Sequence, residues 1–275
     1  MAVRSSVTIE DVAITVDLTG QVALVTGGGK GVGRGITAAF VDAGAHVVIV
    51  SRTKPDAMPP GASHVAADVR DAEAVQRAAR QIVDEHGRLD VAVNNAGGSP
   101  PTDAATASPR FVEKIVALNL LAPLYVAQAA NAVMQGQPDG GVIVNIGSVS
   151  GMRASPGTAV YGAAKAGLAG LTRSLAVEWA PKVRVNLVVA GMVRTEQSAL
   201  YYGDEQGIAA VAATVPAERL ADPADVGSVC VFLASPAASY VSGAEILVHG
   251  GGERPAFLSA ANAESPDTIA NRGRT

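Results

Sequence analysis

Three polar residues in the middle of the chain, Ser148, Tyr161 and Lys165, have the types and spacing needed to move a proton. Tyr161 and Lys165 lie in YGAAKAGLAGLTRSLAVEWA, an alanine-rich segment without internal proline whose apolar residues recur at helical spacing. Residues four apart on a helix share one face, with Cβ atoms about 5–6 Å apart. An ammonium beside a phenol favours the phenolate, so we expect the pKa of Tyr161 to lie below its usual ~10. Such a tyrosine can give a proton to an alkoxide or take one from an alcohol.

Ser148 closes the apolar run GVIVNIGS, which is typical of a buried strand, so its hydroxyl is expected at the strand tip facing a substrate oxygen. The Tyr–Lys pair alone is a weak signal, because a chance match is expected about one time in ten in this chain. The alternative is a surface lysine beside a half-buried tyrosine. The other motifs of the chain are needed to distinguish a catalytic pair from this alternative.

Composition favours a folded α/β chain. Of 275 residues, 48% are hydrophobic and 17% charged, which suits strands buried on both faces of a sheet. No apolar run reaches the ~18–20 residues of a membrane span, and the first residues lack the pattern of a signal peptide. The net charge of -4 gives no basis for nucleic-acid binding. We therefore expect neither a membrane nor a nucleic-acid partner.

Cysteine and histidine usage points to a cytoplasmic protein without a metal. The single Cys230 excludes an intrachain disulfide and lies in the apolar stretch VGSVCVFLA, where a core role is favoured over a reactive one. The four histidines show no metal-ligand spacing with Cys230, so no metal site is predicted.

Short apolar runs rich in Val and Ile alternate with helical patterns along the chain. The runs cover residues 21–26, 46–50, 63–68 (the weakest), 90–95, 141–146, 183–189 and 244–248. The helical patterns cover residues 32–43, 71–86, 109–135, 159–180 and 223–234. This alternation predicts a single-domain, Rossmann-like, doubly wound α/β fold: seven parallel strands with helices on both faces.

A glycine-rich loop, TGGGKGVG at residues 26–33, separates the first run from its helix. Glycines there allow a tight turn and a close backbone approach to a pyrophosphate, which the helix N-terminus then stabilises. The strand–loop–helix setting is the context that a dinucleotide fingerprint requires. In G-x-G-x-x-G the glycines are separated by one residue and then two, whereas three residues separate Gly27 from Gly31 here and one separates Gly31 from Gly33.

The second run ends in Ser51-Arg52, without the acid that NAD enzymes commonly place there for the ribose hydroxyls. The Arg52 guanidinium and the Lys30 ammonium suit the 2′-phosphate of NADP. The alternative for both is a solvated loop charge. We therefore expect NADP(H), with NAD(H) as the alternative.

Together these motifs resemble the short-chain dehydrogenase/reductase family, in its single-domain branch. The matching pieces follow in family order and spacing over about residues 18–252: TGGGKGVG, Asp68-Val69, NNAG at 94–97, Asn119, Ser148, YGAAK at 161–165, and AGMVRT ending at Thr195. The chain departs from the family at Ala190-Gly191, where Pro-Gly is usual, which would loosen the loop at the nicotinamide.

The resemblance implies catalytic roles for four residues. Tyr161 would be the general acid in reduction and the general base in oxidation, and Lys165 would lower its pKa and bind the nicotinamide ribose. Ser148 would bind the substrate oxygen and steady an oxyanion. Asn119 would distort its helix and hold a water in a proton relay. The alternative, an asparagine merely tolerated among leucines, is unattractive because burying it without partners is expensive.

The resemblance also implies cofactor contacts. Asp68 would contact the adenine, residues 95–97 the ribose side, and Thr195 the carboxamide of the nicotinamide. For Asp68, an N-cap role at the next helix is nearly as well supported. The expected cofactor residues are Gly27, Gly29, Lys30, Gly31, Val32, Gly33, Ser51, Arg52, Asp68, Val69, Asn95, Ala96, Gly97, Tyr161, Lys165, Gly191, Val193 and Thr195.

The predicted organisation is an N-terminal extension over residues 1–17, the oxidoreductase domain over 18–252 and a C-terminal tail over 253–275. Residues about 192–216 fall where the family carries its substrate lid, and this segment suits a mobile amphipathic cover. Family members are commonly tetramers or dimers, so we expect a homotetramer or homodimer.

The sequence thus predicts hydride exchange between a nicotinamide and a small carbonyl or alcohol substrate. A 3-oxoacyl thioester, a steroid and a cyclic ketone all stay open, and the apolar lid favours an uncharged ketone. The alternative from another class is a dinucleotide-binding sensor or scaffold without turnover. Binding alone would not need Tyr161, which argues against that alternative.

Overall fold

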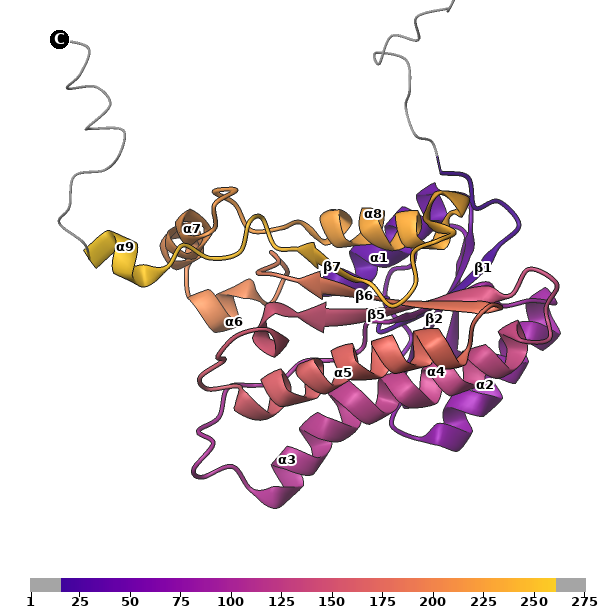
Figure 1. Cartoon of the computed structure of the whole chain (residues 1–275), viewed down its shortest axis with the longest axis horizontal. Helices are drawn as coiled ribbons and strands as arrows, with labels where there is room; N and C mark the ends of the chain where they lie inside the picture. Colours follow the sequence, from indigo (N-terminus) through magenta and orange to yellow (C-terminus); the bar gives the residue numbers. More distant parts are fainter. Residues whose placement is uncertain (1–15, 261–275) are drawn as a thin grey trace, which may run out of the picture.

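Seven parallel strands form one sheet in the order β3-β2-β1-β4-β5-β6-β7 (Figure 1). The computed structural model describes residues 16–260. The strands are β1 (Val22–Thr26), β2 (His46–Ser51), β3 (Ala62–Ala66), β4 (Val91–Asn94), β5 (Gly141–Ser148), β6 (Val183–Ala190) and β7 (Glu245–Val248). All seven predicted runs are therefore strands, and the predicted fold class is confirmed. The weakest, at 63–68, ends two residues early.

The strands are apolar throughout because both faces of the sheet are buried. Along β1, Leu24 packs into the core on one face and Val25 into the core on the other. β2 alternates in the same way at Val48 and Ile49. This is why the strands read as continuous Val/Ile runs rather than as alternating patterns.

Two layers of helices cover the sheet (Figure 1). One layer holds α2 (Ala72–His86), α4 (Ala122–Met134) and α5 (Ala159–Glu178), and the other holds α1 (Gly31–Asp42) and α8 (Pro223–Ala234). The further helices are α3 (Pro109–Val116), α6 (Ser198–Tyr202), α7 (Glu205–Thr214) and α9 (Ala256–Ala260). α6 and α7, which lie inside the predicted lid segment, project beyond the arrowheads of β5 and β6.

Two expectations from composition need comment. Within the part of the chain that the structure describes, the segment Pro109–Met134 is long and apolar enough, by length and composition alone, to cross a membrane, contrary to the expectation that no segment is. It packs against α2 and the sheet, as a core helix does, and Val126 and Met134 are buried. Cys230 is fully buried in the core beside α1, and burial raises the pKa of its thiol to about 12, so it is a core residue.

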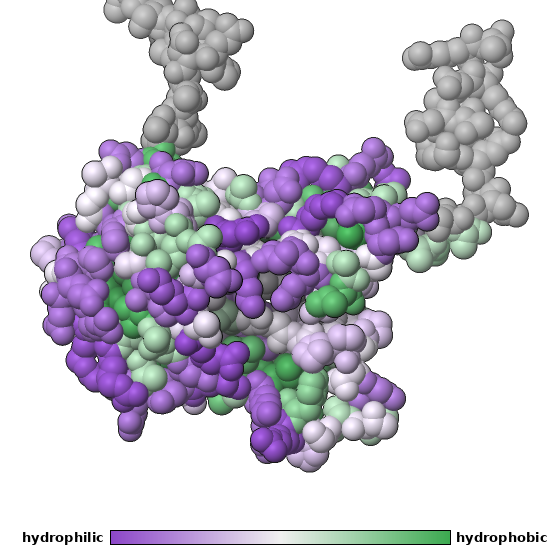
Figure 2. Space-filling view, turned by 180° about the vertical axis from the view of Figure 1, so that it is seen from behind, coloured by the Kyte–Doolittle hydropathy of each residue, from purple (hydrophilic) through white to green (hydrophobic). Residues whose placement is uncertain are grey.

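The face shown in Figure 2 carries hydrophobic residues in small separate groups among hydrophilic ones, rather than as one large patch. The predicted extension at 1–17 and tail at 253–275 fall mostly outside the described residues, so both stay predictions. The side chain of Glu253, at the start of the tail, pairs with Arg153 in the β5–α5 loop.

Candidate active site

A cleft of about 720 Å³ opens at the carboxyl ends of β1, β4 and β5, beside the point where the strand order reverses. Doubly wound sheets bind ligands at this position, because the loops on the two sides of the reversal point diverge there. Of the residues predicted to bind cofactor or catalyse, all but Gly29 and Asn119 line the cleft. A Cβ on Gly29 would lie 2.5 Å from Pro55, so this glycine packs against the loop after β2, and its contact with the cofactor stays a prediction.

The glycine-rich loop turns tightly against β4. A Cβ on Gly33 would lie 2.2 Å from the carbonyl oxygen of Gly27, so only glycine fits. The Asn95 side chain donates to the Thr26 carbonyl at 2.9 Å, and the Thr26 hydroxyl accepts from the Asn95 and Ala96 amides at 2.9 Å each. These bonds leave the loop amides and the N-terminus of α1 facing the cleft, which is a cradle suited to a pyrophosphate.

Asn119 is fully buried in a π-helical turn, Ala117–Leu121, that interrupts the helix running from α3 into α4. Its amide nitrogen donates to the carbonyls of Ile115 and Gly98, at 2.9 and 3.0 Å, and its Oδ1 accepts from the Gly98 amide at 2.8 Å. The expected helix distortion is therefore present. Asn119 lies behind the cleft and holds the loop that follows β4; a Cβ on Gly97 would lie 2.8 Å from its Oδ1.

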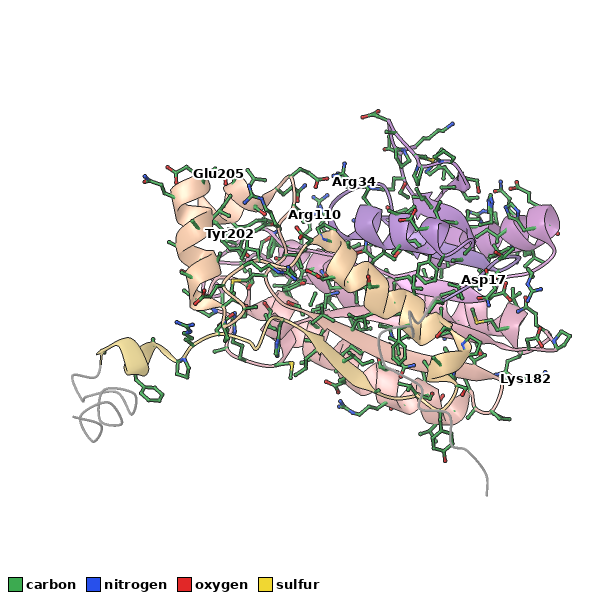
Figure 3. All side chains as sticks on the ribbon, turned by 90° about the horizontal axis from the view of Figure 1, so that it is seen from above. Asp17, Arg34, Arg110, Lys182, Tyr202 and Glu205 are labelled. Carbon is green, nitrogen blue, oxygen red and sulfur yellow. The ribbon has the colours of Figure 1, made fainter. Side chains whose placement is uncertain are left out.

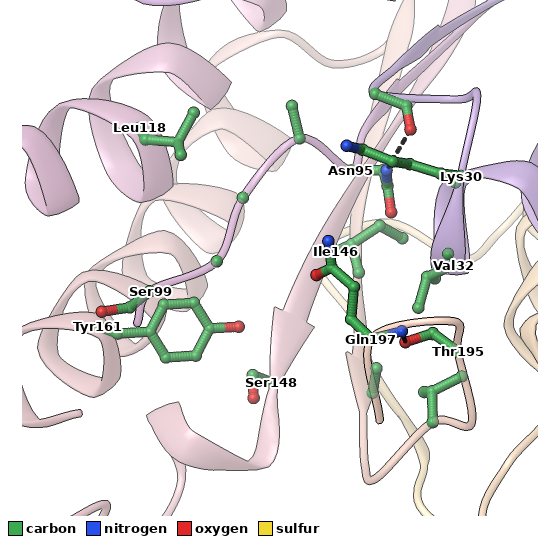
Figure 4. A pocket seen from close by; sticks show the side chains of 18 of the residues that line it. Lys30, Val32, Asn95, Ser99, Leu118, Ile146, Ser148, Tyr161, Thr195 and Gln197 are labelled. Atoms are coloured by element: carbon green, nitrogen blue, oxygen red, sulfur yellow. Dashed lines mark hydrogen bonds between the residues drawn. The ribbon is translucent and has the colours of Figure 1, made fainter. Parts of the chain in front are cut away.

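Ser148 ends β5, and Tyr161 stands in the first turn of α5, both lining the cleft. In Figure 4 the Tyr161 phenol points toward the space beside Ser148, with Thr195 and Gln197 across the cleft. Burial raises the pKa of Tyr161, and a hydrogen bond with Ser148 lowers it by less. The expected fall in the Tyr161 pKa is therefore wrong for this structure, because burial outweighs the polar contacts.

Lys165 shares the helix face of Tyr161, as predicted, but its ammonium does not contact the phenol oxygen. Nζ donates to the Ile146 carbonyl at 2.7 Å and lies 5.7 Å from the centroid of the Tyr161 ring. The side chain is 4% exposed, and this burial lowers the pKa of Lys165 from 10.5 to about 8. The lysine is thus a buried cation at neutral pH, held at the floor of the cleft.

Charged side chains gather at the far end of the cleft, around Lys30 and Arg52. Asp68 forms a bidentate pair with Arg70, with its shorter bond at 2.6 Å, and this hydrogen bonding lowers the pKa of Asp68 to about 2. Asp68 is not the N-cap of α2: Asp71 accepts from the Glu73 and Ala74 amides at 3.0 and 3.1 Å.

The loop after β6 is held in place although it lacks the usual proline. The Gly191 amide donates to the Val248 carbonyl at 2.9 Å, and Val193 bridges to Ala221 in parallel. Thr195 then lies over the glycine-rich loop, 3.7 Å from where a Gly31 Cβ would be. The predicted loosening is thus opposed by backbone pairing.

Several lining residues were not anticipated. Arg70 and Glu196 matter most; Arg70 directly follows Asp68-Val69 and Glu196 directly follows Thr195, yet their types form no pattern that would have marked them. Tyr201 and Tyr202 line the cleft from α6, within the predicted lid (Figure 3 shows Tyr202 at the end of the molecule opposite Lys182). The others are Val50, Ala67, Gly98, Ser99, Leu118, Ile146, Gly147, Ser150, Thr158, Ala190, Gln197 and Ser198. Among the described residues, no cluster of potential metal ligands is present.

Comparisons with known proteins agree with this geometry. The profile of a family described as Enoyl-(Acyl carrier protein) reductase matches residues 27–253. An uncharacterised oxidoreductase of Mycobacterium tuberculosis is 37% identical over 243 residues, covering 85% of this chain and 92% of the relative. A 3-oxoacyl-[acyl-carrier-protein] reductase of Vibrio harveyi is 36% identical over 244 residues, covering 86% and 98%.

Among solved structures, a putative short-chain alcohol dehydrogenase from Sinorhizobium meliloti matches with a TM-score of 0.79 and 37% identity. The match covers 86% of this chain and 98% of that one. Profile, sequence and structure therefore lead to one conclusion: the chain is an oxidoreductase of the short-chain dehydrogenase/reductase family.

Proposed function

We propose that the protein transfers hydride between NADP(H) and a small carbonyl or alcohol substrate, with Tyr161 as the general acid and base. The observation that carries this proposal is that the candidate catalytic residues and the glycine-rich loop meet at one cleft. Ser148, Tyr161 and Lys165 line the same cleft as the glycine-rich loop, and Asn119 holds the loop opposite them. A protein that only bound a dinucleotide would have no use for a phenol and a hydroxyl facing one space.

The cleft fits a nicotinamide dinucleotide. The glycine-rich loop would hold the pyrophosphate at the N-terminus of α1, and Asn95 to Gly97 would lie along the ribose side. Lys165 would donate to the ribose hydroxyls, and Thr195 would reach the carboxamide. When bound, the nicotinamide supplies or accepts the hydride, and the chain supplies orientation and proton transfer.

The two pKa shifts suit the reductive direction. Burial keeps the Tyr161 phenol protonated, so in reduction it is poised to give its proton to the developing alkoxide. The Ser148 hydroxyl would donate to the same oxygen and stabilise its negative charge. Lys165, with a pKa of about 8, keeps its proton at neutral pH and favours the tyrosinate left behind.

The preference for NADP rests on the charges at the far end of the cleft. Lys30, Arg52 and Arg70 line it with two acids, Asp68 and Glu196, so the positive charges are in excess by one. Asp68 is already paired with Arg70, which reduces its repulsion of a phosphate. A 2′-phosphate would meet Lys30 and Arg52 as charge-assisted donors.

Calorimetric titration with NADPH and NADH tests this preference. Two charge-assisted contacts, at ~1.5–3 kcal/mol each, should favour NADPH by at least ~10–100-fold. Arg52→Ala should reduce that ratio by about tenfold or more, whereas Arg80→Ala, an exposed arginine on α2, should leave it unchanged. Equal or tighter binding of NADH to the unmodified protein would refute the NADP assignment.

For the substrate, we propose an uncharged ketone of apolar character. Tyr201 and Tyr202 cover the Tyr161 end of the cleft, and Leu200 beside them is 79% exposed. The similarity to a 3-oxoacyl-[acyl-carrier-protein] reductase of Vibrio harveyi makes 3-oxoacyl thioesters the first compounds to assay, before cyclic ketones and steroids. NADPH oxidation that depends on the ketone distinguishes an enzyme from the alternative, a sensor or scaffold.

We also propose a homotetramer or homodimer built through α5 and its neighbour. Val177 on α5 is 80% exposed and Leu121, in the π-helical turn that packs on α5, is 37% exposed, so both are available to a second copy. Light scattering at micromolar protein tests this proposal, and a monomeric mass would refute it.

A further inference from the structure

An acidic side chain occupies the anion-binding end of helix α1. The Gly31 amide, the first of the helix, donates to Oε1 of Glu196 at 2.9 Å across 165 residues of sequence. Lys30 at the N-cap position makes no capping bond with its own side chain. The first amides of a helix lack partners within the helix, and Glu196 satisfies one of them from a distant loop.

Charges around this contact keep the carboxylate ionised. Hydrogen bonds with its own backbone amide and with that of Gly31, together with the nearby Lys30 and Arg34, lower the pKa of Glu196. Glu196, Gly31 and Lys30 all line the large cleft, so the contact lies inside the cofactor region rather than on an outer surface. A carboxylate thus sits where the loop geometry is arranged to receive a phosphate.

Glu196 is joined directly to the cover of the cleft. The Thr195 amide donates to the Ser198 hydroxyl at 2.9 Å, and the Ser198 amide donates to the Thr195 carbonyl at 3.0 Å. Ser198 is 3% exposed and begins α6, which carries Tyr201 and Tyr202 over Tyr161. Movement of Glu196 would therefore shift the Thr195–Ser198 turn, and with it helix α6, which covers the Tyr161 end of the cleft.

We propose that Glu196 is an internal competitor for the pyrophosphate site, so that dinucleotide binding displaces its carboxylate and releases the turn leading to α6. The inference rests on the proposed dinucleotide binding and adds a residue that tunes it. One amide hydrogen cannot serve a carboxylate and a phosphate fully at once, and two anions at one helix end repel each other. Dinucleotide binding would therefore loosen the cover.

Substitution of Glu196 tests the competition by calorimetry. Glu196→Gln removes the charge and keeps the shape, so we expect ADP and NADPH to bind about tenfold more tightly. Adenosine 2′-monophosphate, which carries no pyrophosphate, should bind with unchanged affinity. The matched control is Glu205→Gln on α7, which removes one charge from the same segment; Glu205 pairs with Arg194. Unchanged or weaker ADP binding by Glu196→Gln would overturn the inference.

Hydrogen exchange without any ligand provides a second readout. Peptides covering residues 196–202 should exchange several-fold faster in Glu196→Gln than in the unmodified protein or in Glu205→Gln. Saturating ADP should raise their exchange in the unmodified protein toward the level of Glu196→Gln. Equal exchange in all three proteins, or protection by ADP, would overturn the inference.

The two proposals fail in different ways. If the unmodified protein binds neither NADPH nor NADH, dinucleotide binding itself is refuted and the competition falls with it. If it binds a dinucleotide and Glu196→Gln binds no more tightly, the proposed function stands and the role of Glu196 is refuted.

Discussion

The floor of the cleft and its cover are built in opposite ways. On the floor, the Thr26 side chain is 2% exposed and makes three hydrogen bonds, and Asn119 and Lys165 are buried with backbone partners. In the cover, α6 and α7 together bury only Ser198 and Ile208. The floor is therefore held by packed polar networks, whereas the cover rests on few contacts.

This difference explains why the floor of the cleft has recognisable sequence motifs and the cover does not. A backbone that approaches a ligand closely has no room for side chains, so the floor needs glycines and short amides at fixed positions. A lightly packed cover accepts many sequences, and loops and short helices of this kind open at low free energy. The floor should respond sharply to single substitutions and the cover weakly.

The largest effect is expected at the floor, from Tyr161→Phe. Loss of the phenol removes proton transfer, so turnover of a ketone should fall by about 10²–10⁴-fold, while NADPH affinity by calorimetry changes little. Tyr240→Phe, at a fully exposed tyrosine, is the matched control. Full activity in Tyr161→Phe would end the proton-transfer assignment.

The next largest effect is on stability, from Thr26→Val. The substitution keeps the shape and leaves the Asn95 and Ala96 amides without their shared acceptor, at about 1–3 kcal/mol each. Urea unfolding should therefore show a loss of about 2–6 kcal/mol. Thr106→Val, at an exposed threonine, should change the free energy of unfolding by less than ~0.5 kcal/mol. A comparable loss in both variants would contradict the contrast.

Lys165→Met should stabilise the protein at pH 7 by about 1–3 kcal/mol while abolishing turnover. The pKa of Lys165 falls from 10.5 to about 8 on folding, so below pH 8 the folded state bears the full cost of a buried cation, up to ~3 kcal/mol. Between pH 8 and 10.5 the unfolded chain binds more protons at this site, so the cost disappears as the pH rises.

Urea unfolding of Lys165→Met at several pH values checks this prediction. Its advantage over the unmodified protein should shrink from pH 8 to pH 10.5, whereas Lys114→Met, at an exposed lysine on α3, should show no such trend. A constant advantage would mean that packing, and not charge, accounts for the gain.

The smallest effect is expected in the cover. Leu200→Ser should change the free energy of unfolding by less than ~0.5 kcal/mol, because Leu200 is 79% exposed. If the cover binds apolar substrates, the KM for a hydrophobic ketone should rise several-fold with little change in kcat. A loss of stability as large as that of Thr26→Val would show that the cover is packed as firmly as the floor.

The sequence predicted the structure best for the strands and helices and for the polar residues at the strand ends. Every predicted strand and helix is present, because Val/Ile runs and helical periodicity report local burial directly. The residues at the strand ends were brought to one cleft, because the carboxyl ends of parallel strands meet at one edge. The pKa of Tyr161 was predicted with the wrong sign, because burial depends on segments far away in sequence.

By itself, the sequence determined the doubly wound fold, the glycine-rich loop and the set of Ser148, Tyr161 and Lys165, since each depends on local spacing and residue type. Only the tertiary structure decided that Asn119 holds Gly98, that Lys165 bonds to Ile146, and that Glu196 caps α1. Each of these joins a side chain to a partner selected by three-dimensional position. Helical or strand periodicity along the chain carries no record of such pairings.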